Sequence, residues 1–495
     1  MGSIDQRESE AEWARSLADG RGGHSGFQLL IHGIEAHARR ALLAERACHS
    51  LDVQTYIFED GHSTRRLLRQ LIQAAQRGVK VRLLLDDLSV GHQQYRLAKL
   101  DSHPNIEVRL FNPIPSGRRF TLTRLASLVL NVRRLHRRMH NKLWLADRSL
   151  AIFGGRNLGD DYFSSDSRHL FIDIDALAVG GETPERLGQS FDAYWSHSLA
   201  VPLWKFARAR DGQAWRALDD ELERICAEPS RTGKEYDEAL DELRRDDRDE
   251  LAGRLEWAAA RVLWDDPEVA AMRGLPPREL RMSGKVVEEL DRVEHSLEVV
   301  SGYLIPHDLD GIDLFALLAR GVKVVAITNA LEATDVPLVH GGYAPWRKPL
   351  LAAGAKLYEI RYQPLTRSRM RARLRARTRL KLSRPRSNSL HAKTFAFDHD
   401  RLMIASFNLD PRSVWWNCEL GVVIESVELN RELRGINAFG ALPEHSYAVH
   451  IDQGRLTWIS DDGNGRLRRY HSERGNPWRR FQAWVARVLR LERLL

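Results

Sequence analysis

The chain has 495 residues, of which 43% are hydrophobic, so we expect a globular protein with two or more folded units. Its 75 Lys and Arg residues against 67 Asp and Glu give a net charge of +8 and a pI near 9.4, which favours polyanionic partners such as nucleic acid or an anionic lipid surface. The three cysteines are far apart and form no CxxC pair, which argues against a disulfide framework and a zinc site of the usual spacing.

The N-terminal part of the chain predicts a polar tail over residues 1–25, followed by alternating strands and helices. "HSLDVQTY" from His49 predicts a strand, and "STRRLLRQLIQAAQRG" from Ser63 predicts a helix with one apolar face that ends near Gly78. "RGVKVRLLLDD" and "IEVRLFNP" predict the next two strands. Strands that alternate with helices are typical of predominantly parallel pairing.

The same series of elements recurs later in the chain. "HSLEVVSGY", "RGVKVVAITNA" and "AKLYEIRYQP" correspond in order to the three strands of the first copy. Internal repetition of this kind predicts two similar α/β halves, over residues 26–202 and 284–495, each a mostly parallel mixed sheet flanked by helices. Residues 203–283 mix acidic and basic side chains at helical spacing, which predicts a charged helical connector.

Each half then carries a histidine and a lysine two residues apart. "MHNKLWLAD" places His140, Lys142 and Asp147 in the first copy, and "LHAKTFAFD" places His391, Lys393 and Asp398 in the second. Residues two apart on a strand face the same side, so we expect each histidine and lysine to share one face of a sheet. In each copy one asparagine follows its histidine at the same separation, and these residues are Asn157 and Asn408.

Paired histidines and lysines suit chemistry on a phosphodiester, if a pseudo-twofold axis brings the two copies together. The lysines would hold the phosphate oxygens, the asparagines would add neutral donors, and the histidines would serve as nucleophile and acid. We assign His140 as the nucleophile and His391 as the acid. A reacting imidazole needs a partner for its other nitrogen, and Asp173 and Glu419, at equivalent positions of the repeat, are the candidates. Asp147 and Asp398 are expected to stabilise the fold.

The duplicated HxKxxxxD pattern resembles the phospholipase D superfamily. "RRMHNK", "GGRNLGDDYF", "SLHAK" and "SFNLDPRS" followed by "NCELGVVIES" are similar to bacterial cardiolipin synthases, specifically the C type. The resemblance implies two phospholipase D-like halves with a single active site, a phosphohistidine intermediate, no metal or cofactor, and transfer of a phosphatidyl group onto phosphatidylglycerol. The donor would be phosphatidylethanolamine or a second phosphatidylglycerol.

Two basic insertions, each directly before a catalytic histidine, predict contact with anionic lipid headgroups. The first is "FTLTRLASLVLNVRRLHRRMH" and the second has arginine at alternate positions. The residues expected to bind headgroups are Arg133, Arg134, Arg137, Arg138, Arg367, Arg369, Arg371, Arg373, Arg375, Arg377 and Arg379. The C-terminal "NPWRRFQAWVARVLRLERLL" predicts a helix that either lies in a membrane interface or packs on the domain.

No apolar run reaches the roughly 20 residues that cross a bilayer, and the polar N-terminus has no signal-peptide core. We therefore expect peripheral association with the cytoplasmic side of a bacterial inner membrane.

Three alternative functions stay open: a phospholipase that uses the same residues, a nuclease, and a lipid-binding module without activity. The nuclease is disfavoured because stacking aromatic residues are not evident among the basic segments, so no nucleic-acid partner is expected. The module is disfavoured because both copies retain His, Lys and Asn.

Overall fold

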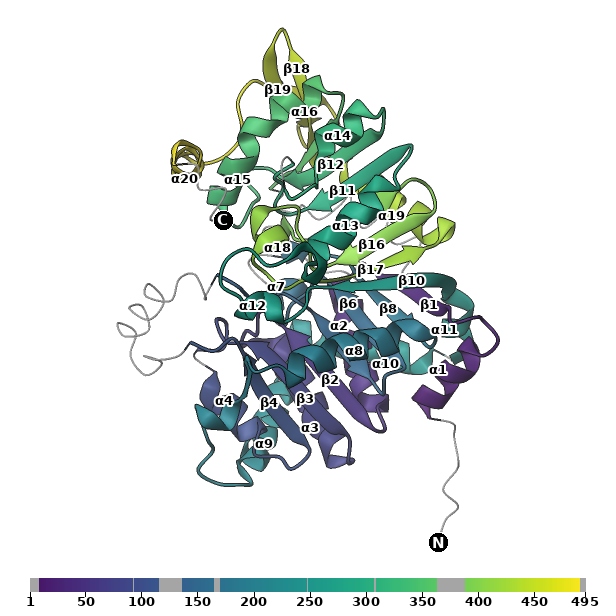
Figure 1. Ribbon diagram of the computed structural model, residues 1–495. Helices are drawn as coiled ribbons and strands as arrows, with labels where there is room; N and C mark the ends of the chain where they lie inside the picture. The colour runs from purple at the N-terminus through teal and green to yellow at the C-terminus, as the bar shows by residue number, and fades with distance from the viewer. Residues whose placement is uncertain are drawn as a thin grey trace. The chain divides into compact units, whose positions relative to one another are not determined.

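The computed structural model describes residues 9–91, 93–114, 136–163, 170–246, 248–306, 309–362 and 388–489. The chain divides into two compact units, which are both visible in Figure 1. Unit 1 comprises Met1–Phe153, Asn157–Phe163 and Asp175–Val262. Unit 2 comprises Gly154–Arg156, Ser164–Ile174 and Leu263–Leu495. Two short pieces of the first sequence copy, one of which contains Asp173, therefore belong to the unit that is built mainly from the second copy.

Unit 1 is a mixed β-sheet flanked by helices (Figure 1). Its strands are β1 (Ser25–Leu30), β2 (Ser50–Thr55), β3 (Lys80–Asp86), β4 (Ile106–Phe111), β5 (Leu143–Ala146), β6 (Leu150–Gly154), β8 (Asp175–Val179), β9 (Ala200–Pro202) and β10 (Glu256–Trp264). Its helices are α1 (Glu10–Ala18), α2 (Gly33–Arg46), α3 (His62–Gln76), α4 (Gln94–Leu100), α7 (Asp160–Phe163), α8 (Glu182–Ser196), α9 (Ala214–Ala227), α10 (Arg231–Arg245) and α11 (Arg248–Arg254).

Unit 2 has the same kind of architecture around its own core. Its strands are β7 (Leu170–Ile172), β11 (Ser296–Ser301), β12 (Lys323–Asn329), β13 (Lys356–Ile360), β14 (Asn388–Leu390), β15 (Lys393–Phe397), β16 (Arg401–Ala405), β17 (Leu420–Glu425), β18 (Ser446–Asp452), β19 (Arg455–Asp461) and β20 (Leu467–Tyr470). Its helices are α12 (Glu268–Ala271), α13 (Met282–Asp291), α14 (Leu314–Ala319), α15 (Pro337–Tyr343), α16 (Arg347–Ala352), α18 (Pro411–Trp415), α19 (Val427–Gly440) and α20 (Pro477–Val488).

The prediction of mostly parallel sheets is wrong. In unit 1, β2–β3 and β3–β4 are parallel, but β5 and β6 continue the sheet in antiparallel pairing. Unit 2 repeats this with β11–β12–β13 parallel and β15, β16 and β17 antiparallel. Connection length explains part of this: a crossover helix allows parallel neighbours, whereas the three-residue turns at 147–149 and 398–400 make β5–β6 and β15–β16 antiparallel hairpins.

Two other boundaries differ from the predicted ones. The predicted polar tail over residues 1–25 contains helix α1, which buries Trp13 and Ala14. The predicted helical connector over residues 203–283 does contain α9, α10 and α11, but it also contains strand β10, which pairs antiparallel with β1. The segment "EWAAARVLW" of β10 has no regular alternation, because only Ala258 and Leu263 are buried and the other residues are half-buried, so the sequence did not predict a strand here.

Candidate active site

In unit 1, His140 and Lys142 lie directly before strand β5 and are both buried. The Lys142 ammonium donates to the His140 carbonyl oxygen at 2.5 Å, so the lysine fixes the backbone of the histidine as well as carrying charge. The Tyr56 ring packs against the His140 ring, with 5.0 Å between centroids, and the Lys142 Nζ lies 5.6 Å from the same tyrosine ring. His140 is therefore enclosed by the protein, with an aromatic ring and a cationic side chain as neighbours.

Asn157 is fully buried in unit 1 and its amide takes part in the fold. Its Oδ1 accepts from the Ile57 N–H at 3.1 Å, and its Nδ2 donates to the Tyr162 hydroxyl at 2.8 Å. In Asn408, its counterpart in unit 2, the backbone N–H donates to the Ser413 hydroxyl oxygen at 3.2 Å. The Asn408 Oδ1 is buried without a hydrogen-bond partner among the described residues. Because an amide oxygen only accepts hydrogen bonds, the Nδ2 group of Asn408 is the end of the side chain that is suited to a phosphate oxygen.

In unit 2, the buried pair of His391 and Asp173 is the strongest candidate for a catalytic dyad. The His391 Nδ1 lies 2.6 Å from the Asp173 Oδ2, so the carboxylate sets the tautomer and the orientation of the imidazole. The Lys393 ammonium donates to the His391 carbonyl oxygen, which repeats the arrangement of Lys142 and His140. His391 Nε2 is therefore the nitrogen that is suited to react with phosphorus or to carry the mobile proton.

The electrostatics of the dyad favour an ionised Asp173. Burial opposes the charge of this carboxyl, but the positive charge of His391, their hydrogen bond and Lys393 outweigh burial and lower the pKa of Asp173 to about 2. Burial lowers the pKa of Lys393, against which Asp173 and Glu419 favour its charged form. An anionic partner at Nδ1 stabilises the imidazolium, which is the form that protonates a leaving group.

A small two-stranded sheet places Asp173 beside His391. Strand β7 pairs in parallel with β14, with Leu170 opposite Asn388 and Ile172 opposite Leu390. The Ile172 carbonyl then accepts from the N–H groups of the next two residues on the other chain segment, His391 at 2.8 Å and Ala392 at 2.9 Å. Gly155 is necessary here because a Cβ at this position would lie only 2.1 Å from the Asp173 Oδ1.

Glu419 stands in a different environment within unit 2. Its carboxylate accepts from the hydroxyls of Ser413 at 2.8 Å and Ser406 at 2.5 Å and from the Asn417 amide at 3.2 Å. Its backbone N–H donates to the Asp265 Oδ2 at 2.7 Å. The carboxylate that is bonded to His391 is thus the one from the first sequence copy, and not the one that follows His391 in sequence.

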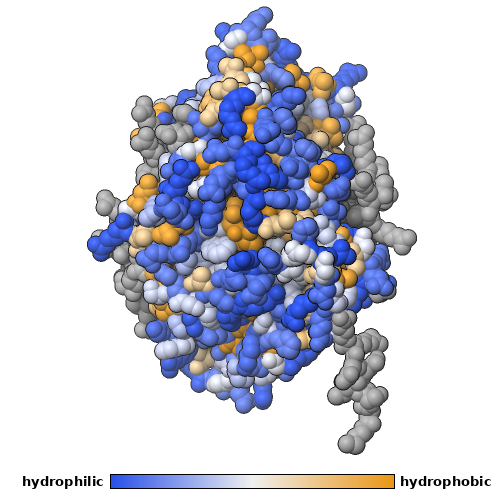
Figure 2. Space-filling model, turned by 45° about the vertical axis from the view of Figure 1, so that its right-hand side comes forward, coloured by the Kyte–Doolittle hydropathy of each residue, from blue (hydrophilic) through white to orange (hydrophobic). Residues whose placement is uncertain are grey.

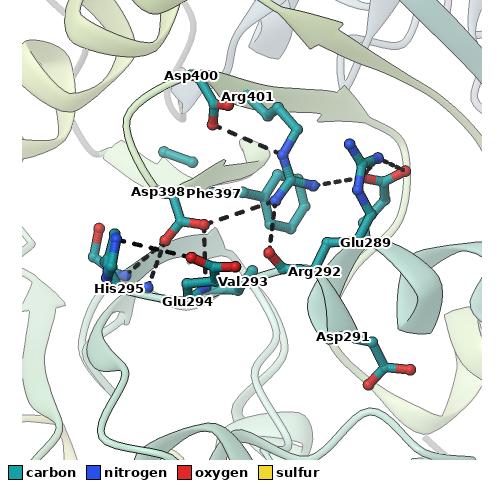
Figure 3. Close-up of polar contacts among 12 residues, drawn as sticks. Glu289, Asp291, Arg292, Val293, Glu294, His295, Phe397, Asp398, Asp400 and Arg401 are labelled. Carbon is teal, nitrogen blue, oxygen red and sulfur yellow. Dashed lines mark hydrogen bonds and ion pairs between the residues drawn. The ribbon is translucent and has the colours of Figure 1, made fainter.

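The side chains of the two motif aspartates bind backbone N–H groups at the starts of strands β11 and β2. The Asp398 Oδ1 accepts from the N–H groups of His295 at 2.7 Å and Ser296 at 3.0 Å, and its Oδ2 accepts from Glu294 at 3.1 Å (Figure 3). Asp147 binds the N–H groups of Cys48, His49 and Ser50 in the same way in unit 1. Each carboxylate thereby ties the turn after the HxK strand to the start of the first parallel strand, which is a structural contact.

Two further positioning residues were missed in the sequence. Asp86 ends β3, and its Oδ2 accepts from the N–H of Met139, the residue before His140, at 3.1 Å. Asn329 ends the equivalent strand β12, and its Oδ1 accepts from the N–H of Leu390, the residue before His391, at 2.7 Å. Asp86 and Asn329 occupy the same position in the repeat, at the ends of "KVRLLLD" and "KVVAITN". This equivalence could have identified them, but it was overlooked because the residue is Asp in one copy and Asn in the other.

The expectation for the first basic insertion needs correction at two residues. Arg138 is completely buried, lies 3.3 Å from Asp86 and donates to the Asn112 carbonyl, so it neutralises a buried carboxylate instead of facing lipid. Arg137 is also buried. The other predicted headgroup residues lie outside the described residues: Arg133, Arg134, Arg367, Arg369, Arg371, Arg373, Arg375, Arg377 and Arg379.

Among the described residues, no helix combines the length and the apolar character that crossing a membrane requires. Helix α20, predicted as the C-terminal helix, is present and carries an exposed aromatic face.

Comparison with known proteins agrees with the duplicated architecture. The family model described as "Cardiolipin synthase, PLD-like domain" matches residues 42–195 and again residues 286–437. Cardiolipin synthase C of Escherichia coli K12 is 34% identical over 483 residues, which cover 96% of this chain and 97% of that protein. Cardiolipin synthase B of Shigella flexneri is 22% identical and covers 82% of this chain and 78% of that protein.

A solved structure supports the fold over nearly the whole length. The crystal structure of phosphatidylserine synthase from Haemophilus influenzae Rd KW20 has a TM-score of 0.60 to this chain, at 12% identity, and covers 97% of this chain and 100% of that one. At 12% identity this similarity shows the fold alone. The two matched copies and the full-length similarity together show that the chain belongs to the cardiolipin synthase family with phospholipase D-like domains.

Proposed function

We propose that the chain is a phosphatidyltransferase that transfers a phosphatidyl group onto phosphatidylglycerol and so makes cardiolipin. The observation that carries this proposal is the buried His391–Asp173 dyad on a duplicated HxK motif, in a chain that is similar over its full length to a cardiolipin synthase. The duplication further supports one active site in which both histidines act on the same phosphorus atom.

In the proposed mechanism His140 attacks the donor phosphodiester and His391 protonates the departing alkoxide. The oxygen–phosphorus bond to the donor alcohol breaks as the nitrogen–phosphorus bond to His140 forms, and Lys142 and Lys393 offset the charge on the phosphate oxygens. The hydroxyl of phosphatidylglycerol then gives its proton to His391 and displaces His140 from phosphorus. One phosphodiester replaces another, so the reaction needs no nucleotide.

Asp173 supports the acid role of His391, because a carboxylate at Nδ1 stabilises the protonated ring. By equivalence in the repeat, Glu419 is proposed as the orienting carboxylate of His140. Asn157 and Asn408 are proposed to contribute amide donors to the phosphate, and Asp147 and Asp398 to maintain the strands that present the histidines.

The proposed setting is the cytoplasmic side of a bacterial inner membrane, where the chain binds peripherally to an anionic surface and meets its lipid substrates. The net charge of +8 supports this setting.

Product analysis on vesicles of phosphatidylglycerol and phosphatidylethanolamine tests the proposal. Cardiolipin with release of glycerol or ethanolamine is the expected result. Phosphatidic acid as the sole product would make the protein a hydrolase, and cleavage of DNA without lipid turnover would make it a nuclease.

Trapping of the covalent intermediate tests the roles of the two histidines. It should label the peptide that contains His140, and label on the His391 peptide would reverse the two roles.

A further inference from the structure

Helix α20 is fixed to unit 2 by one of its faces. It packs beside α15 (Figure 1), and the contact is close because Gly341 has no side chain: a Cβ at this position would lie 2.4 Å from the Ala483 carbonyl oxygen. Ala486 is fully buried in this contact. The Arg479 guanidinium donates to the carbonyl oxygens of Leu331 and Thr334, at 3.2 and 2.5 Å. The helix therefore presents a defined opposite face.

That opposite face is an exposed row of large apolar side chains. Trp478, Phe481 and Trp484 are 64%, 49% and 50% exposed, and their rings stack in sequence with centroids 5.5 and 6.1 Å apart. Val488 and Leu489 extend the row. We call Trp478, Phe481 and Trp484 the aromatic ridge.

A continuous ridge of this kind differs from the scattered apolar residues of an ordinary surface. On the face shown in Figure 2 the hydrophobic side chains occur in small groups among hydrophilic ones. Keeping three stacked aromatic side chains in water costs free energy that an isolated fold would avoid, so a row on one rigid helix indicates a binding surface.

The sequence on either side of the ridge residues is rich in arginine. The stretch from Arg466 to Leu489 contains seven arginines and one acidic residue, Glu473. Glu473 is itself paired with His340 and Arg347. The exposed arginines of the stretch are Arg466, Arg468, Arg469, Arg474, Arg480 and Arg487. Helix α20 itself carries Arg479, Arg480 and Arg487 and no acidic residue, which favours a partner with a dense array of negative charge.

Neither copy of the matched domain includes α20. The second match to the family model ends at residue 437, and α20 begins at Pro477. The ridge is thus not part of the duplicated catalytic framework, and a separate task explains its presence better than substrate chemistry does.

We propose that the aromatic ridge of α20 inserts into the interface of an anionic bilayer and anchors unit 2 there. Tryptophan prefers the headgroup region, because its ring is apolar and its N–H is polar. Phenylalanine adds apolar area that inserts beside it, and arginines pair with the lipid phosphates. This inference rests on the proposed function only in that the substrate is a membrane lipid.

The test compares the variant Trp478→Ser/Phe481→Ser/Trp484→Ser with the matched control Trp204→Ser. Trp204 is also exposed, at 47%, and lies beneath the Arg208 guanidinium at 4.7 Å, but it belongs to unit 1 and to no apolar row. Cosedimentation with phosphatidylglycerol–phosphatidylethanolamine vesicles should show the ridge variant binding roughly tenfold or more weakly, while the control binds as the unmodified protein does.

Salt separates insertion from charge attraction. Since apolar insertion is not screened by salt, the unmodified protein should keep part of its vesicle binding at 1 M salt, and the ridge variant should keep almost none. Turnover of a short-chain phosphatidylglycerol dissolved below its micelle concentration should be the same for both, as should the midpoint of chemical unfolding.

Each other outcome has a distinct meaning. Equal vesicle binding by the ridge variant and the unmodified protein at both salt concentrations overturns the inference. A ridge variant that binds vesicles normally but no longer self-associates in light scattering assigns the ridge to a contact between copies of the chain, which also overturns it. Ridge-dependent binding without any cardiolipin product leaves the inference standing and rejects the proposed function.

Discussion

At the scale of single residues, Asp173 shows what the sequence could and could not predict. The repeat identifies Asp173 and Glu419 as equivalent carboxylates, but it contains no information on which histidine each one faces. The answer depends on the pairing of β7 with β14, a contact of three residues between segments more than 200 positions apart. Short strands with so distant a partner have no local signature.

The variant Asp173→Asn should lose most of its activity. Asparagine keeps the size of the side chain but removes the charge that orients His391 and stabilises its protonated form. We expect kcat to fall by roughly two to four orders of magnitude with little change in KM, as judged from initial rates of lipid product. Asp400→Asn, at an exposed carboxylate of the same unit, is the control and should behave as the unmodified protein. A loss of less than about threefold would show that His391 does not need this partner.

The same variant should alter the dependence of stability on pH. The pKa of Asp173 is lowered from 3.8 to about 2, since the charge of His391 outweighs the effect of burial. A depressed pKa stabilises the folded state above the unfolded-state pKa of about 3.9, and this contribution is lost as the pH falls toward 2. Urea unfolding at several pH values should therefore show a shallower loss of stability between pH 4 and 2 for Asp173→Asn. Parallel curves for the two proteins would contradict the assignment.

At the scale of elements, the sequence predicted the strands better than their directions. The three parallel strands were predicted in both copies, and the helix between the first two strands was predicted in the first copy. Its amphipathic pattern is a strong signal: Leu67, Leu68, Leu71, Ile72 and Ala75 are all buried as expected. The hairpins were misjudged because "ADRS" and "FDHDR" do not contain the Gly that marks a tight turn. Instead, Asp147 and Asp398 adopt the left-handed backbone conformation with φ of 49° and 44°.

Replacing Asp398 with alanine should destabilise unit 2. Three backbone N–H groups would lose a charged acceptor, which we expect to lower the free energy of unfolding by about 3 kcal/mol in chemical denaturation. The backbone bonds also lower the pKa of Asp398 despite its burial, so the bonds favour the ionised form. The nearby Asp400→Ala serves as the matched control and should cost less than about 0.5 kcal/mol. Equal losses for the two variants would mean that the backbone bonds are not what stabilises this turn.

Asn329 should control the position of His391. Its amide accepts from the Leu390 N–H and donates to the Leu390 carbonyl at 2.8 Å, so Asn329→Ala removes both constraints on the residue before the histidine. We expect a fall in kcat of roughly tenfold or more with KM nearly unchanged. Asn329→Asp keeps the acceptor for the Leu390 N–H and should recover part of kcat; no difference in kcat between the two variants would leave Asn329 with a purely structural role.

At the scale of the whole molecule, the division of the chain departs from the boundaries that composition indicated. Residues 203–262 belong to unit 1 together with the first copy. They do so because strand β10, at the end of the charged segment, pairs with β1 of the unit 1 sheet. Charge patterning correctly located the helices α9 to α11 there but could not reveal a strand whose partner lies at the start of the chain.

Binding of the second basic insertion to anionic lipid remains a prediction. Its alternate arginines between 367 and 379 should attract anionic lipid, so replacement of Arg367, Arg371, Arg375 and Arg379 by glutamine should weaken vesicle binding at low salt. The difference from the unmodified protein should vanish at high salt, where charge attraction is screened. Unchanged binding in cosedimentation at low salt would reject this role.

The pairing of β7 with β14 has a consequence for any division of the chain. A fragment that starts at residue 203 keeps His391 but lacks the aspartate that its ring binds. A chain that carries only the second copy could form this contact only if another chain supplied Asp173. A single polypeptide instead guarantees one such aspartate for each His391.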